Sequence, residues 1–126
     1  MGYKLNHIHL VCRDLQRMID FFSENFDASL IAMKQFGGAD GASLDLSGVT
    51  INLRVTQEGE ALLADTAEKT YGYHHIGIDV DDIDATYKKL TDKGFAFSVP
   101  PKDLPEYRIA FFDGPENVTI ELLQKK

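Results

Sequence analysis

The chain has 126 residues, of which 44% are hydrophobic and 26% charged, a balance typical of one folded globular domain and not of a disordered chain. Asp and Glu number 20 against 13 Lys and Arg, so the net charge is −7, which argues against nucleic-acid and membrane-surface partners. The single cysteine, Cys12, excludes an internal disulfide and is typical of a reducing compartment, and no apolar run approaches the length of a membrane span. We therefore expect a cytoplasmic domain whose partner is a small molecule or another protein.

The first half of the chain alternates between strand and helix patterns. Residues 4–11 have the period of a strand, and Asp14 has the position of an N-cap before a helix with inward residues Leu15, Met18, Ile19, Phe22 and Phe26. Three further strands are predicted, at 28–36, 42–47 and 49–55. The stretch from Gly37 to Gly41 joins the first two of these strands, and Ser47-Gly48 predicts a tight turn between the last two.

The second half of the chain repeats this order. A strand is predicted at 73–80, followed by a helix that Asp82 caps and Gly94 ends, with inward residues Ile83, Tyr87 and Leu90. Three more strands are predicted, at 95–99, 107–112 and 118–124. Pro100 and Pro101 are expected to break the path after the first of these strands.

Two matches at nearly equal offset indicate an internal duplication. The pattern of a histidine followed after six residues by aspartate and an aliphatic residue begins at His7 and again at His75, an offset of 68. The segment VTINL at 49–53 matches VTIEL at 118–122, an offset of 69. The duplication predicts two structurally related halves.

These halves predict an α+β fold. We expect two tandem βαβββ modules that form a half-open eight-stranded mixed sheet, with the helices on its outer face. The predicted organisation is one domain over 1–126, with module one at 1–56, a linker at 57–72 and module two at 73–126. Because a half-open sheet leaves strand edges that need cover, we also expect a homodimer.

All four histidines fall in the first predicted strand of one module or the other. Strand alternation places His7 and His9 on the concave face of the sheet, with the more apolar positions of that strand toward the helix. By the same parity His75 faces the concave side, whereas His74 faces away and is expected to be structural. His9 is open to three interpretations: a further ligand, a proton shuttle or a wall of the cavity.

Polar residues from other strands share this concave parity. Asn52 and Glu121 occupy matching positions of the repeat, and Asp45 faces the same side from a neighbouring strand. If the modules pack about a pseudo-dyad, Asn52 and Glu121 approach the axis that His7 and His75 approach. Two neutral imidazoles and a carboxylate suit one divalent ion, such as Zn, Ni, Co, Mn or Fe(II), with positions left for water or substrate.

The sequence resembles the vicinal oxygen chelate superfamily, which includes glyoxalase, bleomycin-resistance protein and extradiol dioxygenase. The likeness covers essentially the whole chain and is carried by LNHIHLVCRDL at 5–15, YHHIGIDVDDIDA at 73–85 and RIAFFDGPENVTIELL at 108–123. The middle segment is similar to methylmalonyl-CoA epimerase. In this family the first-strand histidine, the second histidine of the pair and the final-strand glutamate bind the metal. The resemblance therefore implies the metal ligands His7, His75 and Glu121, which strand parity also selects.

Asn52 departs from the family pattern. Glyoxalase I-like members carry a glutamate at this position and the epimerase a glutamine, whereas the Asn52 amide can offer a carbonyl oxygen or bind substrate but cannot act as a base. The candidate catalytic bases are therefore Glu121 first, then Asp45 or His9.

Two arginines are candidates for binding an anionic group of the substrate. Arg54 and Arg108 are assigned concave parity and could pair a carboxylate or phosphate, although ordinary surface cations would have the same pattern.

The resemblance implies a metal-dependent isomerase or lyase that stabilises the enolate of a small carbonyl compound or thioester. One alternative is an extradiol dioxygenase-like Fe(II) enzyme, ranked lower because Phe111 and Phe112 stand where that group places a tyrosine and no histidine follows His75. The other alternative is a metal-free protein that binds a small molecule such as a drug, against which the intact set of metal ligands argues.

Overall fold

The computed structural model describes residues 2, 4–60 and 73–126, and the chain divides into two compact units, Met1–Asp65 and Thr66–Lys126. Each unit contains one βαβββ module. Most of the predicted linker, residues 61–72, lies outside the described residues.

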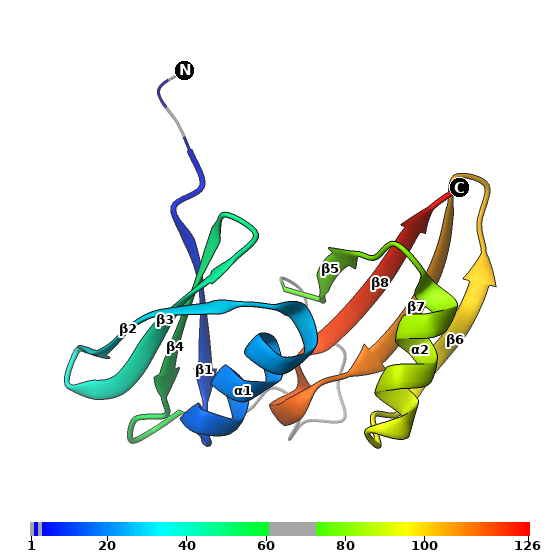
Figure 1. The fold of residues 1–126 in the computed structure, drawn as a ribbon. Helices are drawn as coiled ribbons and strands as arrows, with labels where there is room; N and C mark the ends of the chain where they lie inside the picture. Colours follow the sequence, from blue (N-terminus) through cyan, green and yellow to red (C-terminus); the bar gives the residue numbers. More distant parts are fainter. Residues whose placement is uncertain (1, 3, 61–72) are drawn as a thin grey trace. The chain divides into compact units, whose positions relative to one another are not determined.

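Module one contains a four-stranded sheet in the order β1-β4-β3-β2 with one helix against it (Figure 1). Strands β1 and β4 are parallel, and the other two pairs are antiparallel. The helix α1 packs against β2, β3 and β4. The elements are β1 (His7–Cys12), α1 (Leu15–Phe26), β2 (Ser29–Phe36), β3 (Ala39–Leu46) and β4 (Val49–Val55).

The predicted start of α1 is confirmed. The Asp14 carboxylate accepts a hydrogen bond from the Arg17 N–H at 3.0 Å, which satisfies one of the free donors of the first turn. Met18 and Phe22 are fully buried, and their apolar counterparts on the sheet include Leu44 and Leu53, also fully buried. The core of module one therefore lies between α1 and one face of the sheet.

Both predicted turns of module one are present, and one glycine has a different role. Ser47 and Gly48 have φ values of 51° and 89°, the left-handed conformation that a two-residue hairpin turn requires. Gly41 lies within β3, where an added Cβ would meet the Leu53 carbonyl oxygen and, at 2.6 Å, the ring of Phe36. Glycine is therefore required at 41 by close packing.

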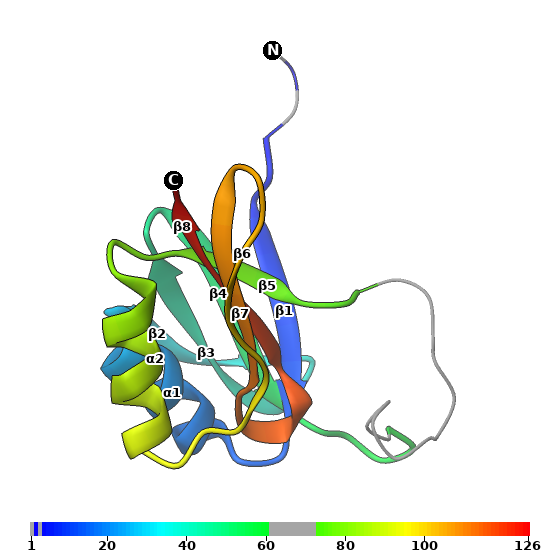
Figure 2. The ribbon, with the colours of Figure 1, turned by 90° about the vertical axis from the view of Figure 1, so that its right-hand side faces the viewer.

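Module two repeats the architecture, with strand order β5-β8-β7-β6, a parallel β5–β8 pair and α2 against β6, β7 and β8 (Figures 1 and 2). The Asp82 carboxylate caps α2 by accepting from the Ala85 N–H at 3.0 Å, and Gly94, with a φ of 94°, follows its end. The elements are β5 (Ile76–Asp79), α2 (Ile83–Asp92), β6 (Phe97–Asp103), β7 (Tyr107–Asp113), the 3-10 helix η2 (Pro115–Asn117) and β8 (Thr119–Lys125).

The expectation that Pro100 and Pro101 break the chain path is wrong, because β6 continues through both to Asp103. β6 is an edge strand, and its register with β7 shifts between Val99 and Lys102. Proline lacks the N–H that a central strand donates to its neighbour, but an irregular edge strand does not need that donor.

The two tandem βαβββ modules of the predicted α+β fold are thus confirmed. The eight strands, expected in one half-open sheet, are hydrogen-bonded as two four-stranded sheets, one in each module. None of the helices formed by residues 2, 4–60 and 73–126 has the length and apolar character needed to cross a membrane.

Candidate functional site

Strand register places the selected polar residues of module one on the sheet face opposite α1. His9 lies beside Asn52, and Asn52 lies opposite Ser43. The alternate positions of these strands carry the buried apolar residues that face α1. The predicted parity of the site residues in β1, β3 and β4 is confirmed, while their chemical roles stay predictions.

Asn52 is buried, with 8% of its surface exposed, and its amide oxygen accepts a hydrogen bond from the Ser43 hydroxyl at 2.5 Å. Ser43 lies on the same sheet face as Asn52, so strand alternation could have predicted that the two side chains are neighbours. The hydrogen bond fixes the orientation of the amide and directs its carbonyl oxygen, the predicted metal or substrate contact, toward Ser43.

The two histidines of β1 have different surroundings. Both residues are exposed, and His7 Nδ1 lies 2.8 Å from Asn6 Oδ1. The ring of His9 packs edge-on against Phe36 with centroids 4.7 Å apart. Partial burial, together with the charges of Arg54 and His7, holds the pKa of His9 below its ordinary value of 6.5. The lowered pKa favours the neutral form of the His9 ring.

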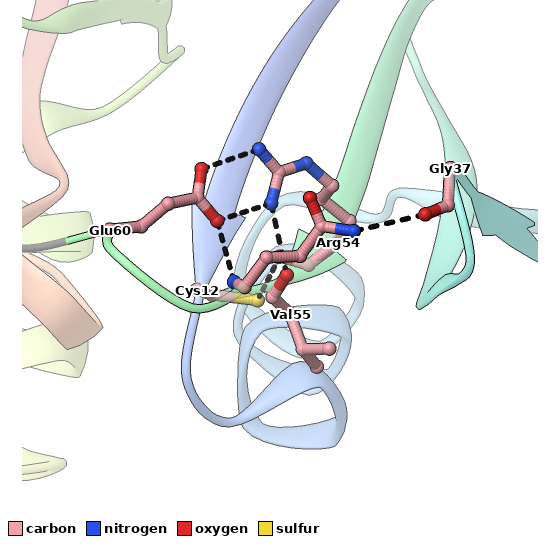
Figure 3. Close-up of polar contacts among 6 residues, drawn as sticks. Cys12, Gly37, Arg54, Val55 and Glu60 are labelled. Atoms are coloured by element: carbon pink, nitrogen blue, oxygen red, sulfur yellow. Dashed lines mark hydrogen bonds and ion pairs between the residues drawn. The ribbon is translucent and has the colours of Figure 1, made fainter.

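Arg54 makes a two-pronged ion pair with Glu60 (Figure 3). Nη1 donates to Glu60 Oε1 at 2.7 Å and Nη2 to Oε2 at 2.6 Å, while Nη1 also donates to the Val55 carbonyl at 3.1 Å. The Gln57 N–H donates to the same carboxylate at 2.6 Å. Hydrogen bonds from Arg54 and Gln57 hold the pKa of Glu60 at about 2. Sequence reasoning missed Glu60, because it lies in the turn after β4 and outside any periodic pattern.

Asp45 has the predicted parity, opposite Thr50, and its carboxylate accepts from the Gly48 N–H at 3.4 Å. This contact supports the hairpin turn. The role of Asp45 as a base stays a prediction.

Module two brings together two of the three predicted metal ligands. His75 Nε2 lies 2.9 Å from Glu121 Oε2, with 30% and 16% of the respective side chains exposed. Phe111 and Gly77 flank Glu121 on the neighbouring strands, and the Phe111 ring packs edge-on against His75 with centroids 5.1 Å apart. An imidazole and a carboxylate therefore meet on the sheet face opposite α2, next to a residue without a side chain.

His74 contacts the site although its parity predicted that it faces away. Its Nδ1 lies 2.8 Å from His75 Nδ1, so His75 has a polar neighbour at each ring nitrogen. The parity argument does not hold here because residues 73–75 precede β5 and are not held in its pleat.

The concave placement of Arg108 is wrong. In β7 it alternates with Ile109 and shares a face with the fully buried Ala110, the face that α2 covers. Its guanidinium donates to Asp84 in the first turn of α2, from Nη2 at 2.9 Å and from Nε at 3.2 Å, and Nη1 lies 3.4 Å from Asp103. These carboxylates direct Arg108 toward the helix and away from the face of Glu121.

Within the described residues no three His, Cys, Asp or Glu side chains form a group that could hold a metal ion. His75 and Glu121 form a pair in module two, and the third predicted ligand, His7, belongs to module one. The donor set of this pair fits a divalent ion, because imidazole nitrogen and carboxylate oxygen are the ligands that such ions take at catalytic sites.

Comparison with known proteins assigns the family. The model described as the Glyoxalase/Bleomycin resistance protein/Dioxygenase superfamily matches residues 4–122. The chain belongs to this superfamily. The match includes both histidine-bearing strands and Glu121, and so covers all but the last residue of the segments on which the resemblance rested.

Among members of known activity, the chain is 28% identical to a lactoylglutathione lyase of Schizosaccharomyces pombe over 98% of its own length. It spans about half of that relative, 48%.

Solved structures of similar proteins share the fold. A glyoxylase/bleomycin resistance protein/dioxygenase domain from Frankia sp. EAN1pec is 24% identical, with a TM-score of 0.79 and 100% of both chains covered. The fosfomycin resistance protein FosX of Listeria monocytogenes, solved as a mutant with Mn(II) and 1S,2S-dihydroxypropylphosphonic acid, is 22% identical, with a TM-score of 0.77 over 100% of this chain and 95% of that one. At this identity the likeness establishes the fold.

Proposed function

We propose that the chain is a metal-dependent isomerase or lyase that stabilises the enolate of a small carbonyl compound or thioester. The observation that carries this proposal is the contact of His75 Nε2 with Glu121 Oε2 at 2.9 Å on the sheet face opposite α2. Superfamily membership and the 28% identity to a lactoylglutathione lyase support it.

His7, His75 and Glu121 would hold one divalent ion of the Zn, Ni, Co, Mn or Fe(II) group, with Asn52 or water completing its shell. The presence of Mn(II) in the related FosX structure supports a metal of this kind. When bound, such an ion supplies Lewis acidity that lowers the cost of negative charge on a carbonyl oxygen.

Proton transfer is assigned to this chain's own side chains. Glu121 is the first candidate, because it lies at the pair and its carboxylate contacts His75 through one oxygen, Oε2. Asp45 and His9 remain the alternative bases, and the lowered pKa of His9 favours the neutral ring, which can accept a proton. Asn52, held by Ser43, would position the substrate rather than exchange protons.

Exchange of a substrate's α-hydrogen for deuterium tests the proposal, since it reports proton abstraction before any later step. We would incubate the metal-loaded protein in heavy water with methylmalonyl thioesters, α-hydroxy ketones and hemithioacetals, and follow exchange by NMR. We expect exchange with at least one class, its loss in Glu121→Gln, and its retention in Asp79→Asn, a matched charge change on the same face of the sheet.

Two outcomes would overturn the assignment. Absence of exchange combined with oxygen uptake and consumption of catechols by the Fe(II)-loaded protein would establish a dioxygenase. Absence of both reactions combined with tight binding of a cationic drug to the metal-free protein would establish a binding protein.

A further inference from the structure

We propose that Arg54 binds an oxyanion of the substrate, a carboxylate or a phosphate, and that Glu60 is the internal carboxylate which this group replaces. The inference rests on the proposed function, because it adds an anionic group to the substrate of the same site.

The position of Arg54 in the sheet gives the first argument. Arg54 lies in β4 two residues beyond Asn52, on the sheet face opposite α1. In the parallel register of β1 and β4, Asn52 lies beside His9. An anion on Arg54 would therefore lie at one end of the row that His9 and Asn52 form.

The geometry of the ion pair gives the second argument. Both Glu60 oxygens lie on the two terminal nitrogens of Arg54, at 2.7 and 2.6 Å, the parallel arrangement through which arginine recognises carboxylate and phosphate groups (Figure 3). Glu60 thus shows that the Arg54 fork is oriented to receive a two-oxygen anion.

The chain segment that carries Glu60 gives the third argument. Glu60 lies in the exposed turn after β4, only six residues from Arg54, and its N–H donates to the Gln57 carbonyl at 3.1 Å. The two paired side chains are 19% and 34% exposed. Ion pairs that are partly open to solvent contribute little to stability, so an external anion can replace Glu60 at small cost.

Arg108 provides the contrast within the same chain. It also forms a two-pronged pair, with Asp84, but it lies on the face that α2 covers and has a second carboxylate, Asp103, at 3.4 Å. Removal of Asp84 deletes one negative charge, as removal of Glu60 does, without changing the face that carries Arg54. Asp84→Asn is therefore a matched control for Glu60→Gln.

The test is a titration of the full-length, metal-free protein with sodium acetate, and separately with inorganic phosphate, at constant ionic strength. The signal is the NMR resonance of the Arg54 Nε–H group. Glu60→Gln should bind acetate about two- to fivefold more tightly at Arg54 than the unaltered chain does, the range that loss of one competing exposed ion pair allows. The glutamine can still accept the Gln57 N–H, which preserves the turn.

We expect Asp84→Asn to leave the affinity at Arg54 unchanged and Arg54→Gln to abolish the change that acetate causes at neighbouring amides. Comparison of the acetate and phosphate titrations shows which oxyanion the fork prefers. An equal gain in Glu60→Gln and Asp84→Asn would overturn the proposal, since net charge would then explain the effect. Absence of any response of Arg54 to either anion in a folded Glu60→Gln protein would overturn it as well. Because no metal or turnover is involved, these results are independent of the deuterium-exchange experiment.

Discussion

The Glu60 carboxylate makes a small, acid-sensitive contribution to the stability of the fold, because its ion pair with Arg54 is partly open to solvent. Its pKa of about 2 lies below the ordinary value of 4.5, so the charged form stabilises the folded state at any pH above about 4.5, and this contribution is lost as the pH falls toward about 2. We expect Glu60→Gln to reduce the pH dependence of the free energy of unfolding within this window, measured by chemical denaturation at a series of pH values. Glu58→Gln, in the same turn, is the charge control. An unchanged dependence in Glu60→Gln would contradict the ion pair.

Addition of a single methyl group at Gly41 should strongly reduce the stability of the fold. Its Cβ would meet the Leu53 carbonyl oxygen, which the sheet holds in place, and the ring of Phe36. We expect Gly41→Ala to lower the free energy of unfolding by about 1–3 kcal/mol, as overpacking of a core does. Gly77→Ala should cost less, because its Cβ would meet the rotatable end of the Leu123 side chain at 3.2 Å. Thermal unfolding of both variants measures the difference, and equal stabilities would contradict this explanation.

The sequence located those residues whose position follows from a pattern of their near neighbours in the chain. Strand alternation is local, and it placed His9, Asn52 and Arg54 on the correct face. The same argument failed for Arg108. An error of one residue in the assumed alternation of a strand moves every side chain to the opposite face. In addition, the partner of Arg108, Asp84, lies in a helix, which strand alternation does not describe. Glu60 could not be found this way, since its contact is made by a turn.

Both helices begin at an aspartate N-cap, and removal of such a cap should lower the free energy of unfolding by a measurable amount. Replacement of Asp82 by alanine leaves the Ala85 N–H without its carboxylate acceptor and should lower the free energy of unfolding by about 1 kcal/mol. Asp81→Ala, one residue earlier and outside the cap, should change it much less. Chemical denaturation distinguishes the two, and an equal loss of stability in both variants would contradict the cap assignment.

The order of strands and helices was predictable because periodicity, caps and turn residues act over a few residues. The extent of β6 was not, since continuation through Pro100 and Pro101 depends on the place of the strand at the sheet edge and on its irregular register with β7. Pairing partners decide both properties, and the sequence of the segment does not contain them.

The whole molecule consists of two copies of one module, and the duplication predicted this from the offsets between His7 and His75 and between the two final strands. Each sheet has two edge strands, and β2 in module one carries exposed apolar residues, namely Leu30, Ile31 and Met33. We expect a homodimer that covers such edges. Sedimentation at micromolar concentration should show a species of about twice the chain mass of 14.1 kDa, and a species of the chain mass alone would contradict the prediction.

Metal analysis is the most direct test of the proposal that His7, His75 and Glu121 hold one divalent ion per chain. The protein is purified without chelator or nickel column and dialysed against the ion. We expect one ion per chain in the unaltered protein and in Asp79→Asn, and loss of most of it in His75→Ala. His74→Ala should keep the stoichiometry with weaker affinity, because His74 contacts the ligand His75 without being one. Equal occupancy in folded His75→Ala and unaltered protein would show that His75 is not a metal ligand.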